Sequence, residues 1–195
     1  MGAKKIKYVD GNMFQYEIYD LVDKYDPILY KPTQEYIFTK NYFKPEEDAG
    51  YIAMSLFETM QSLGGLGLSA NQVGLPYKVC AVSVGDRVIV MFNPKITNSI
   101  GFSTLKEGCL SFPGLYLTLN RAQAITVEFQ GISGNKEIVS LEGIPAVCAQ
   151  HEIDHLNGIC YTKKVSPIVL EREKAKIKKN LKNIKKNFNK IVMSA

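Results

Sequence analysis

Both histidines of the chain lie in one pentapeptide, His151-Glu-Ile-Asp-His155, with Glu152 directly after the first histidine. Apolar residues recur at helical spacing just before it, Pro145 suits a first helical turn, and Gly158 suits a helix end. Residues four apart share one face of a helix, so both imidazoles are expected to point the same way. Two imidazoles at this spacing with a glutamate between them match two metal ligands and a general base. The pentapeptide alone also allows a helix with two hydrogen-bonded polar residues.

A metal held by two histidines needs a further protein ligand, which must be Cys, Asp or Glu because no other histidine exists. Cys109 lies between a glycine and a proline-terminated turn, which predicts irregular backbone rather than a core strand. A small buried hydrophobic residue is the other interpretation, since free cysteines usually have that role. The remaining cysteines, Cys80, Cys148 and Cys160, show no disulfide spacing, so we expect reduced thiols.

The elements that must position these residues follow from apolar periodicity and turn signals. Helices are expected at residues 45–63, 144–157 and 167–193, strand pairs at 78–84 with 87–92 and at 123–130 with 136–141, and an extended segment at 26–32. Neither repeats nor a long linker interrupt the chain, so we expect one domain.

Composition is that of a soluble globular protein, with 195 residues, 46% hydrophobic and 22% charged. No run of 18 apolar residues exists, and no apolar stretch follows the basic N-terminus, so we expect neither a membrane span nor a secretory signal. Residues 166–195 contain nine basic and two acidic residues, a net charge of +7 within a total of +5. The basic character therefore belongs to the last helix and not to the preceding residues.

Three stretches resemble, in order and spacing, the three motifs of the peptide deformylase family. They read Gly65-Leu-Gly-Leu-Ser-Ala-Asn-Gln72, Glu107-Gly-Cys-Leu-Ser111 and His151-Glu-Ile-Asp-His155. The first departs from the family pattern at Ser69 and Asn71, where relatives commonly have small residues or proline, but it keeps Gln72. The resemblance covers roughly residues 26–165. It implies an α+β fold: a single domain of antiparallel β-sheets packed around a central metal-binding helix, with an N-terminal-half helix and a C-terminal basic helix.

The resemblance implies that Cys109, His151 and His155 hold one divalent metal, with water as fourth ligand. Family members typically use Fe(II) and tolerate nickel, cobalt or zinc. The implied reaction removes the N-formyl group from the initiator methionine of nascent polypeptides and releases formate. Glu152 would take a proton from the metal-activated water and pass it to the leaving amine. Donors to the oxyanion would be the Gln72 side chain and the Leu110 backbone N–H, although Gln72 could also orient the loop.

Substrate contacts are expected on two sides of the metal. Ile144, Val147 and Cys148 share the helix face of His151 and would line a pocket for the methionine side chain, with plain core packing as the alternative. By resemblance, the backbones of Leu66, Gly67 and Gly108 form a strand-like docking edge for the peptide. We also expect Glu107 to pair with Arg121 and brace the metal loop.

We expect a monomer of one catalytic domain spanning residues 1–195, in which residues 1–25 precede the motif region and residues 167–195 form a basic helix. The expected location is cytoplasmic, in a bacterial-type cytosol, including that of an infected host cell, or in an organelle stroma or matrix. The basic helix is either solvated with its apolar stripe packed on the domain or a contact for ribosomal RNA.

Two other functions compete with this one. A zinc endopeptidase would take Glu171 or Glu173 as third ligand, which would leave Cys109 and Gln72 without a role. An RNA-binding module with a structural metal would need four protein ligands, and only three strong candidates exist.

Overall fold

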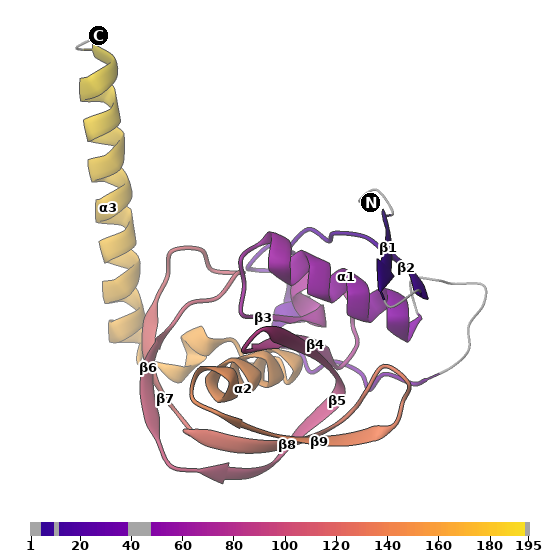
Figure 1. Cartoon of the computed structure of the whole chain (residues 1–195). Coiled ribbons are helices and arrows are strands. Elements are labelled where there is room, and N and C mark those ends of the chain that lie inside the picture. The colour runs from indigo at the N-terminus through magenta and orange to yellow at the C-terminus, as the bar shows by residue number, and fades with distance from the viewer. Residues whose placement is uncertain (1–4, 10–11, 39–47, 194–195) are drawn as a thin grey trace.

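The computed structural model describes residues 5–9, 12–38 and 48–193, which form an α+β structure (Figure 1). The elements in chain order are β1 (Lys5–Val9), β2 (Asn12–Tyr16), η1 (Pro27–Tyr30), α1 (Ala49–Ser62), β3 (Gly67–Ser69), η3 (Ala70–Val73), β4 (Val79–Val84), β5 (Arg87–Ile100), β6 (Ser103–Glu107), β7 (Leu117–Arg121), β8 (Ala124–Gln130), β9 (Lys136–Glu142), α2 (Ile144–Leu156), η4 (Tyr161–Lys164) and α3 (Pro167–Met193).

All strands pair in antiparallel fashion. The main sheet has five strands in the order β3-β4-β5-β8-β9, and β1-β2 and β6-β7 form two separate pairs. Figure 1 shows α2 lying within the curve of the main sheet, while α1 lies beyond β3 and β4. The motif residues therefore come from a helix, a sheet edge and the separate β6-β7 pair.

The main sheet buries a different helix on each face. In β4, Val79 and Ala81 belong to the core cluster around α1, whereas Cys80 and Val82 belong to the cluster around α2. This alternation is the two-residue period of a strand whose two faces are both covered. The packing fixes α2 against the sheet, so the direction in which its histidines point is set by the core.

Most elements expected from the sequence are present. The strand pairs and the helices at 144–157 and 167–193 are confirmed, and α1 begins at Ala49, with residues 45–47 outside the described part. The extended segment predicted at 26–32 is wrong: Pro27–Tyr30 forms the 3-10 helix η1. Asp26 caps it by accepting a hydrogen bond from Ile28 N at 2.9 Å, and Pro27 suits its first turn.

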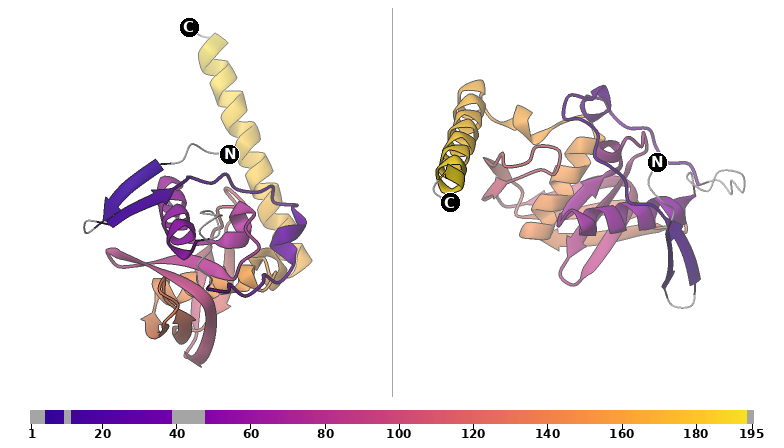
Figure 2. Two further views of the ribbon diagram at one scale, coloured as in Figure 1. Left: turned by 90° about the vertical axis from the view of Figure 1, so that its right-hand side faces the viewer. Right: turned by 90° about the horizontal axis from the view of Figure 1, so that it is seen from above.

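The C-terminal helix α3 stands away from the body of the molecule (Figures 1 and 2). In its first half, Leu170 and Ile177 pack against a cluster that includes Leu115 and Tyr161. Further along, the apolar residues Leu181 and Ile184 are 61% and 65% exposed. Among the described side chains, the apolar stripe thus continues past Ile177 with exposed residues.

Candidate metal centre and active site

Helix α2 carries three of the candidate site side chains into the interior. It begins at Ile144 with Pro145 in its first turn, and Gly158, with a φ of 72°, follows its end. His151, Glu152 and His155 are 6%, 4% and 0% exposed. The two imidazole ring centres lie 4.9 Å apart. The four-residue spacing therefore places both rings on one buried face, as predicted.

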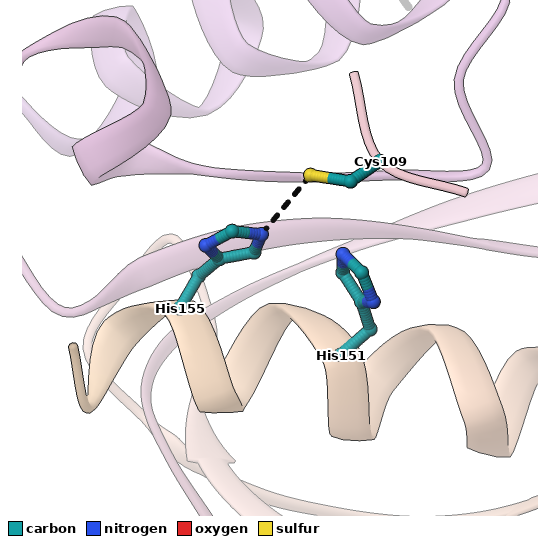
Figure 3. A group of neighbouring side chains, drawn as sticks. All are labelled: Cys109, His151 and His155. Carbon is teal, nitrogen blue, oxygen red and sulfur yellow. Dashed lines mark hydrogen bonds between the residues drawn. The ribbon is translucent and has the colours of Figure 1, made fainter. Parts of the chain in front are cut away.

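Cys109 reaches these rings from the irregular segment that follows β6. Its Sγ lies 3.3 Å from His155 Nε2, and the candidate donor atoms of Cys109, His151 and His155 all lie within 4.8 Å of one another. Figure 3 shows the thiol facing the two rings from the opposite side of the site. One sulfur and two nitrogens thus converge on one point.

The donor set fits a divalent metal. Within the described part of the chain, His155 Nδ1 is buried and has no hydrogen-bond partner, so Nε2 is the ring nitrogen that faces the cluster. Thiolate and imidazole ligands suit zinc or iron. Three protein donors leave one coordination position open, which distinguishes catalytic from structural sites.

An ion-pair network contacts the Nδ1 side of the His151 ring. Glu107 Oε2 lies 2.9 Å from His151 Nδ1, and Arg121 donates to both oxygens of Glu107 at 2.8 and 2.9 Å, as expected from the sequence. Burial opposes ionisation of Glu107, but the hydrogen bonds from Arg121 and His151 outweigh it and lower the Glu107 pKa to about 2. A carboxylate that accepts from Nδ1 leaves the opposite ring nitrogen available for a metal.

Two further partners in this network were not expected from the sequence. Asp154 accepts from Arg121 and also pairs with Lys164, whose Nζ lies 2.8 Å from Asp154 Oδ2. Asp154 is the fourth residue of the histidine pentapeptide, but nothing in the spacing indicates which cation it meets. The signal that could have raised the question is a charged residue inside a mostly buried helix.

Glu152 lies beside the histidines with little free space around it. Its Oε2 is buried and has no hydrogen-bond partner among the described residues, and burial raises the Glu152 pKa to about 7. A Cβ added at Gly67 would lie 2.5 Å from Glu152 Oε1. Gly67 is therefore the residue of β3 that allows the carboxylate to approach the strand. A carboxyl with a pKa near neutrality suits a group that takes and returns a proton.

Gln72 is held by hydrogen bonds at both ends of its amide. Its Oε1 accepts from Ser69 N at 3.0 Å and from Ser69 Oγ at 2.9 Å. Its Nε2 donates to Ser111 Oγ at 3.0 Å and lies 3.5 Å from Cys109 Sγ. The amide donor therefore faces the cysteine loop, in which Phe112 N donates to Cys109 O and closes a turn around Leu110. Ser111 was not identified from the sequence.

A cavity of about 630 Å³ opens beside these groups. Its lining includes Gln72, Cys109, Leu110, His151 and Glu152. All six residues expected to contact substrate also line it: Leu66, Gly67, Gly108, Ile144, Val147 and Cys148. The structure thus brings the predicted substrate contacts together with the reactive groups in one cavity.

Comparisons with known proteins agree with this geometry. A family model described as polypeptide deformylase matches residues 18–171. The chain belongs to this family. A peptide deformylase of Neisseria meningitidis is 38% identical over 131 residues, which cover 66% of this chain and 78% of that protein. A peptide deformylase structure from Legionella pneumophila has a TM-score of 0.74 at 30% identity and covers 86% of this chain and 97% of that chain. One from Synechococcus elongatus in complex with actinonin has a TM-score of 0.71 at 29% identity and covers 81% and 85%.

Membership of the deformylase family and the Cys109, His151 and His155 cluster together support a divalent metal ion at this place. The endopeptidase alternative is wrong, because the third group at the histidines is Cys109. Glu171 instead pairs with Lys174 at 2.9 Å, and Glu173 lies among basic side chains of the same helix. Among the described residues, no helix is both long and apolar enough to cross a membrane.

Proposed function

We propose that this chain hydrolyses the N-formyl group of the initiator methionine of nascent polypeptides and releases formate. Membership of the deformylase family supports the reaction. The single observation that carries the proposal at the level of residues is the meeting of Cys109, His151 and His155 within 4.8 Å beside the buried Glu152.

Cys109, His151 and His155 would hold the metal, natively Fe(II), with zinc, nickel or cobalt as substitutes. When bound, a divalent ion in such a site acts as a Lewis acid that lowers the pKa of water. The sulfur and imidazole donors support this assignment, since both ligand types suit iron and zinc. Glu107 would keep His151 in one tautomer through its 2.9 Å contact with Nδ1.

Glu152 is the proton carrier in this proposal. It takes a proton from the attacking water and delivers it to the methionine nitrogen when the C–N bond breaks. The oxygen of the formyl group becomes negative as the water adds, and the Gln72 Nε2 and the Leu110 backbone N–H would donate to it. Loss of one such donor typically costs about 2.7–4 kcal/mol of transition-state stabilisation.

The cavity walls would place the substrate. The apolar surfaces of Ile144, Val147 and Cys148 would receive the methionine side chain beside His151. The backbones of Leu66, Gly67 and Gly108 would pair with the extended peptide, which leaves side chains free to vary after methionine. Gly108 leaves room for the Tyr116 ring, because an added Cβ would lie 2.8 Å from that ring.

The experiment measures formate release from formyl-Met-Ala-Ser by anaerobically purified protein, with acetyl-Met-Ala-Ser as the unreactive control. Glu152→Gln should keep the metal and lose turnover, whereas Glu128→Gln, which removes an exposed carboxylate from β8, should behave as wild type. Cys109→Ser should lose metal or activity. Equal cleavage of both peptides, or wild-type turnover by Glu152→Gln, would contradict the proposal.

We further propose that α3 contacts ribosomal RNA. Its basic side chains, including Lys178, Lys179 and Lys182, lie on a helix that stands away from the domain (Figure 1), and lysines that contact phosphates give salt-dependent binding. Replacing these three lysines with Gln should weaken ribosome co-sedimentation at low salt without changing formate release. Unchanged co-sedimentation would count against this contact.

The remaining expectations are also proposals: one catalytic domain over residues 1–195, with residues 1–25 ahead of the motif region and residues 167–195 as a basic helix, a monomeric state, and a cytoplasmic or organellar location. The molar mass measured by light scattering at several protein concentrations tests whether the protein is a monomer.

A further inference from the structure

The mouth of the catalytic cavity carries one exposed charge, on Lys106. Among the described residues that line the cavity, the charged ones are Lys106, Glu107 and Glu152. The two glutamates are only 7% and 4% exposed, and Arg121 neutralises Glu107 through two hydrogen bonds. An approaching peptide therefore meets a cation at the rim, and the acidic groups lie behind it.

The rim around this cation is otherwise apolar. Leu66, Tyr116 and Ile144 line the cavity and are 55%, 53% and 60% exposed. Lys106 Nζ lies 5.4 Å from the centre of the Tyr116 ring. Cation–π contact at this distance is favourable and keeps the ammonium near the ring. Because Tyr116 also packs over Gly108, the ammonium is held next to the proposed docking edge.

Lys106 also points away from the reactive groups. Successive side chains of a strand point to opposite faces, and Glu107, the next residue of β6, faces inward to Arg121 and His151. Within the described part of the chain, no carboxylate lies within ion-pair distance of Lys106, and its ammonium instead lies over the Tyr116 ring. Its charge is available to a ligand.

We propose that Lys106 makes the site select formyl-methionyl peptides with an acidic side chain in the two residues after methionine and disfavour basic ones. This inference rests on the proposed function, because it needs the peptide to leave the cavity along Gly108. An extended peptide advances about 3.3 Å per residue, so those two residues pass the rim. An exposed charge pair contributes little by itself. Attraction of an Asp side chain and repulsion of a Lys side chain should together make kcat/KM about 3- to 10-fold higher for the Asp peptide than for the Lys peptide.

The test compares formate release from formyl-Met-Asp-Ser, formyl-Met-Ala-Ser and formyl-Met-Lys-Ser, and from a second series with the charge one residue later. Wild-type protein should prefer the Asp peptide to the Lys peptide in at least one series. Lys106→Gln should abolish the preference, and Lys106→Glu should reverse it. The matched control is Lys136→Gln, which removes an exposed lysine of β9 that does not line the cavity, and it should retain the wild-type ratio. Because the charge of Lys106 and that of the peptide side chain would meet in solvent, raising the salt concentration should also reduce the ratio of kcat/KM between the Asp and Lys peptides.

The outcomes separate the two proposals. Failure of wild-type protein to hydrolyse formyl-Met-Ala-Ser would overturn the proposed function. Hydrolysis of all peptides with equal kcat/KM, or a preference that survives in Lys106→Glu, would overturn the assignment to Lys106 and leave the proposed function intact.

Discussion

A single methyl group added at Gly67 tests the placement of Glu152. The new Cβ would lie 2.5 Å from Glu152 Oε1, 2.8 Å from its Cγ and 2.9 Å from its Cδ. Ordinary contact begins at 3.4 Å, so the carboxylate must move by about 0.9 Å. Glu152 is buried and cannot swing into solvent. Gly67 has no positive φ, so alanine is compatible with the backbone and the clash is the main perturbation.

A misplacement of about 1 Å in an active site can cost about 100-fold in rate. We therefore expect Gly67→Ala to lower kcat about 100-fold, which is about 2.7 kcal/mol at about 1.36 kcal/mol per tenfold change. KM and metal content should change little, because the substitution leaves the backbone of β3 and the three ligand atoms in place. Formate release over a range of formyl-Met-Ala-Ser concentrations separates kcat from KM, and elemental analysis reports the metal.

Two comparisons make this prediction refutable. Glu152→Asp retracts the carboxylate by one methylene, so its cost should be smaller in the Gly67→Ala background than in wild type. In Gly131→Ala the new Cβ would lie 2.0 Å from Glu137 Oε1, but Glu137 is exposed and free to move, so activity should stay at the wild-type level. A wild-type kcat in Gly67→Ala would refute this reasoning. Losses of activity that are strictly additive in the Gly67→Ala, Glu152→Asp double variant would show that the clash with Glu152 is not the cause of the Gly67→Ala loss.

Three further predictions follow from the surroundings of the site. Glu107→Gln removes the charge that Arg121 binds and weakens the acceptor of His151, so metal affinity, measured by competition with a chelator, should fall about 10- to 100-fold; unchanged affinity would show that His151 is oriented otherwise. Asn71→Ala removes the 2.6 Å hydrogen bond to the buried His155 carbonyl and should lower the free energy of unfolding in urea by about 1–3 kcal/mol. Chelator treatment should lower the melting temperature, because a ligand bound only by the folded state stabilises it, and adding Fe(II), Zn, Ni or Co should restore it.

Local features of the sequence were enough to predict the helix that carries the histidines. His151 and His155 are one helical turn apart, and the start and end signals at Pro145 and Gly158 agree with the observed limits of α2. The strand pair β4-β5 was predictable for the same reason, since its partners adjoin in sequence and turn at Gly85. In these elements the interactions that decide the structure lie within a few residues of each other.

The β6-β7 pair could not be predicted in this way. In β7, Leu117 and Leu119 are buried as alternating apolar residues should be, but the next buried position is occupied by Arg121. A buried arginine contradicts the expected pattern unless its carboxylate partners are known. Glu107, at the end of β6, was an expected partner, but Asp154, from α2, was not. Resemblance to the family, and not periodicity, led to Cys109, which lies 46 residues before His155.

Residues of the histidine pentapeptide thus make contacts on two sides of α2. His151 and His155 face Cys109, and Asp154 faces Arg121. Arg121 also binds Glu107, and Glu107 contacts His151. A shift of α2 by one residue would turn its side chains by about 100°, and would separate both sets of partners at once. Buried ion pairs are weak evidence for stability, because the loss of hydration offsets their attraction. Here the series of contacts begins and ends on α2, so it fixes the rotation of this helix about its axis and with it the direction of both imidazoles.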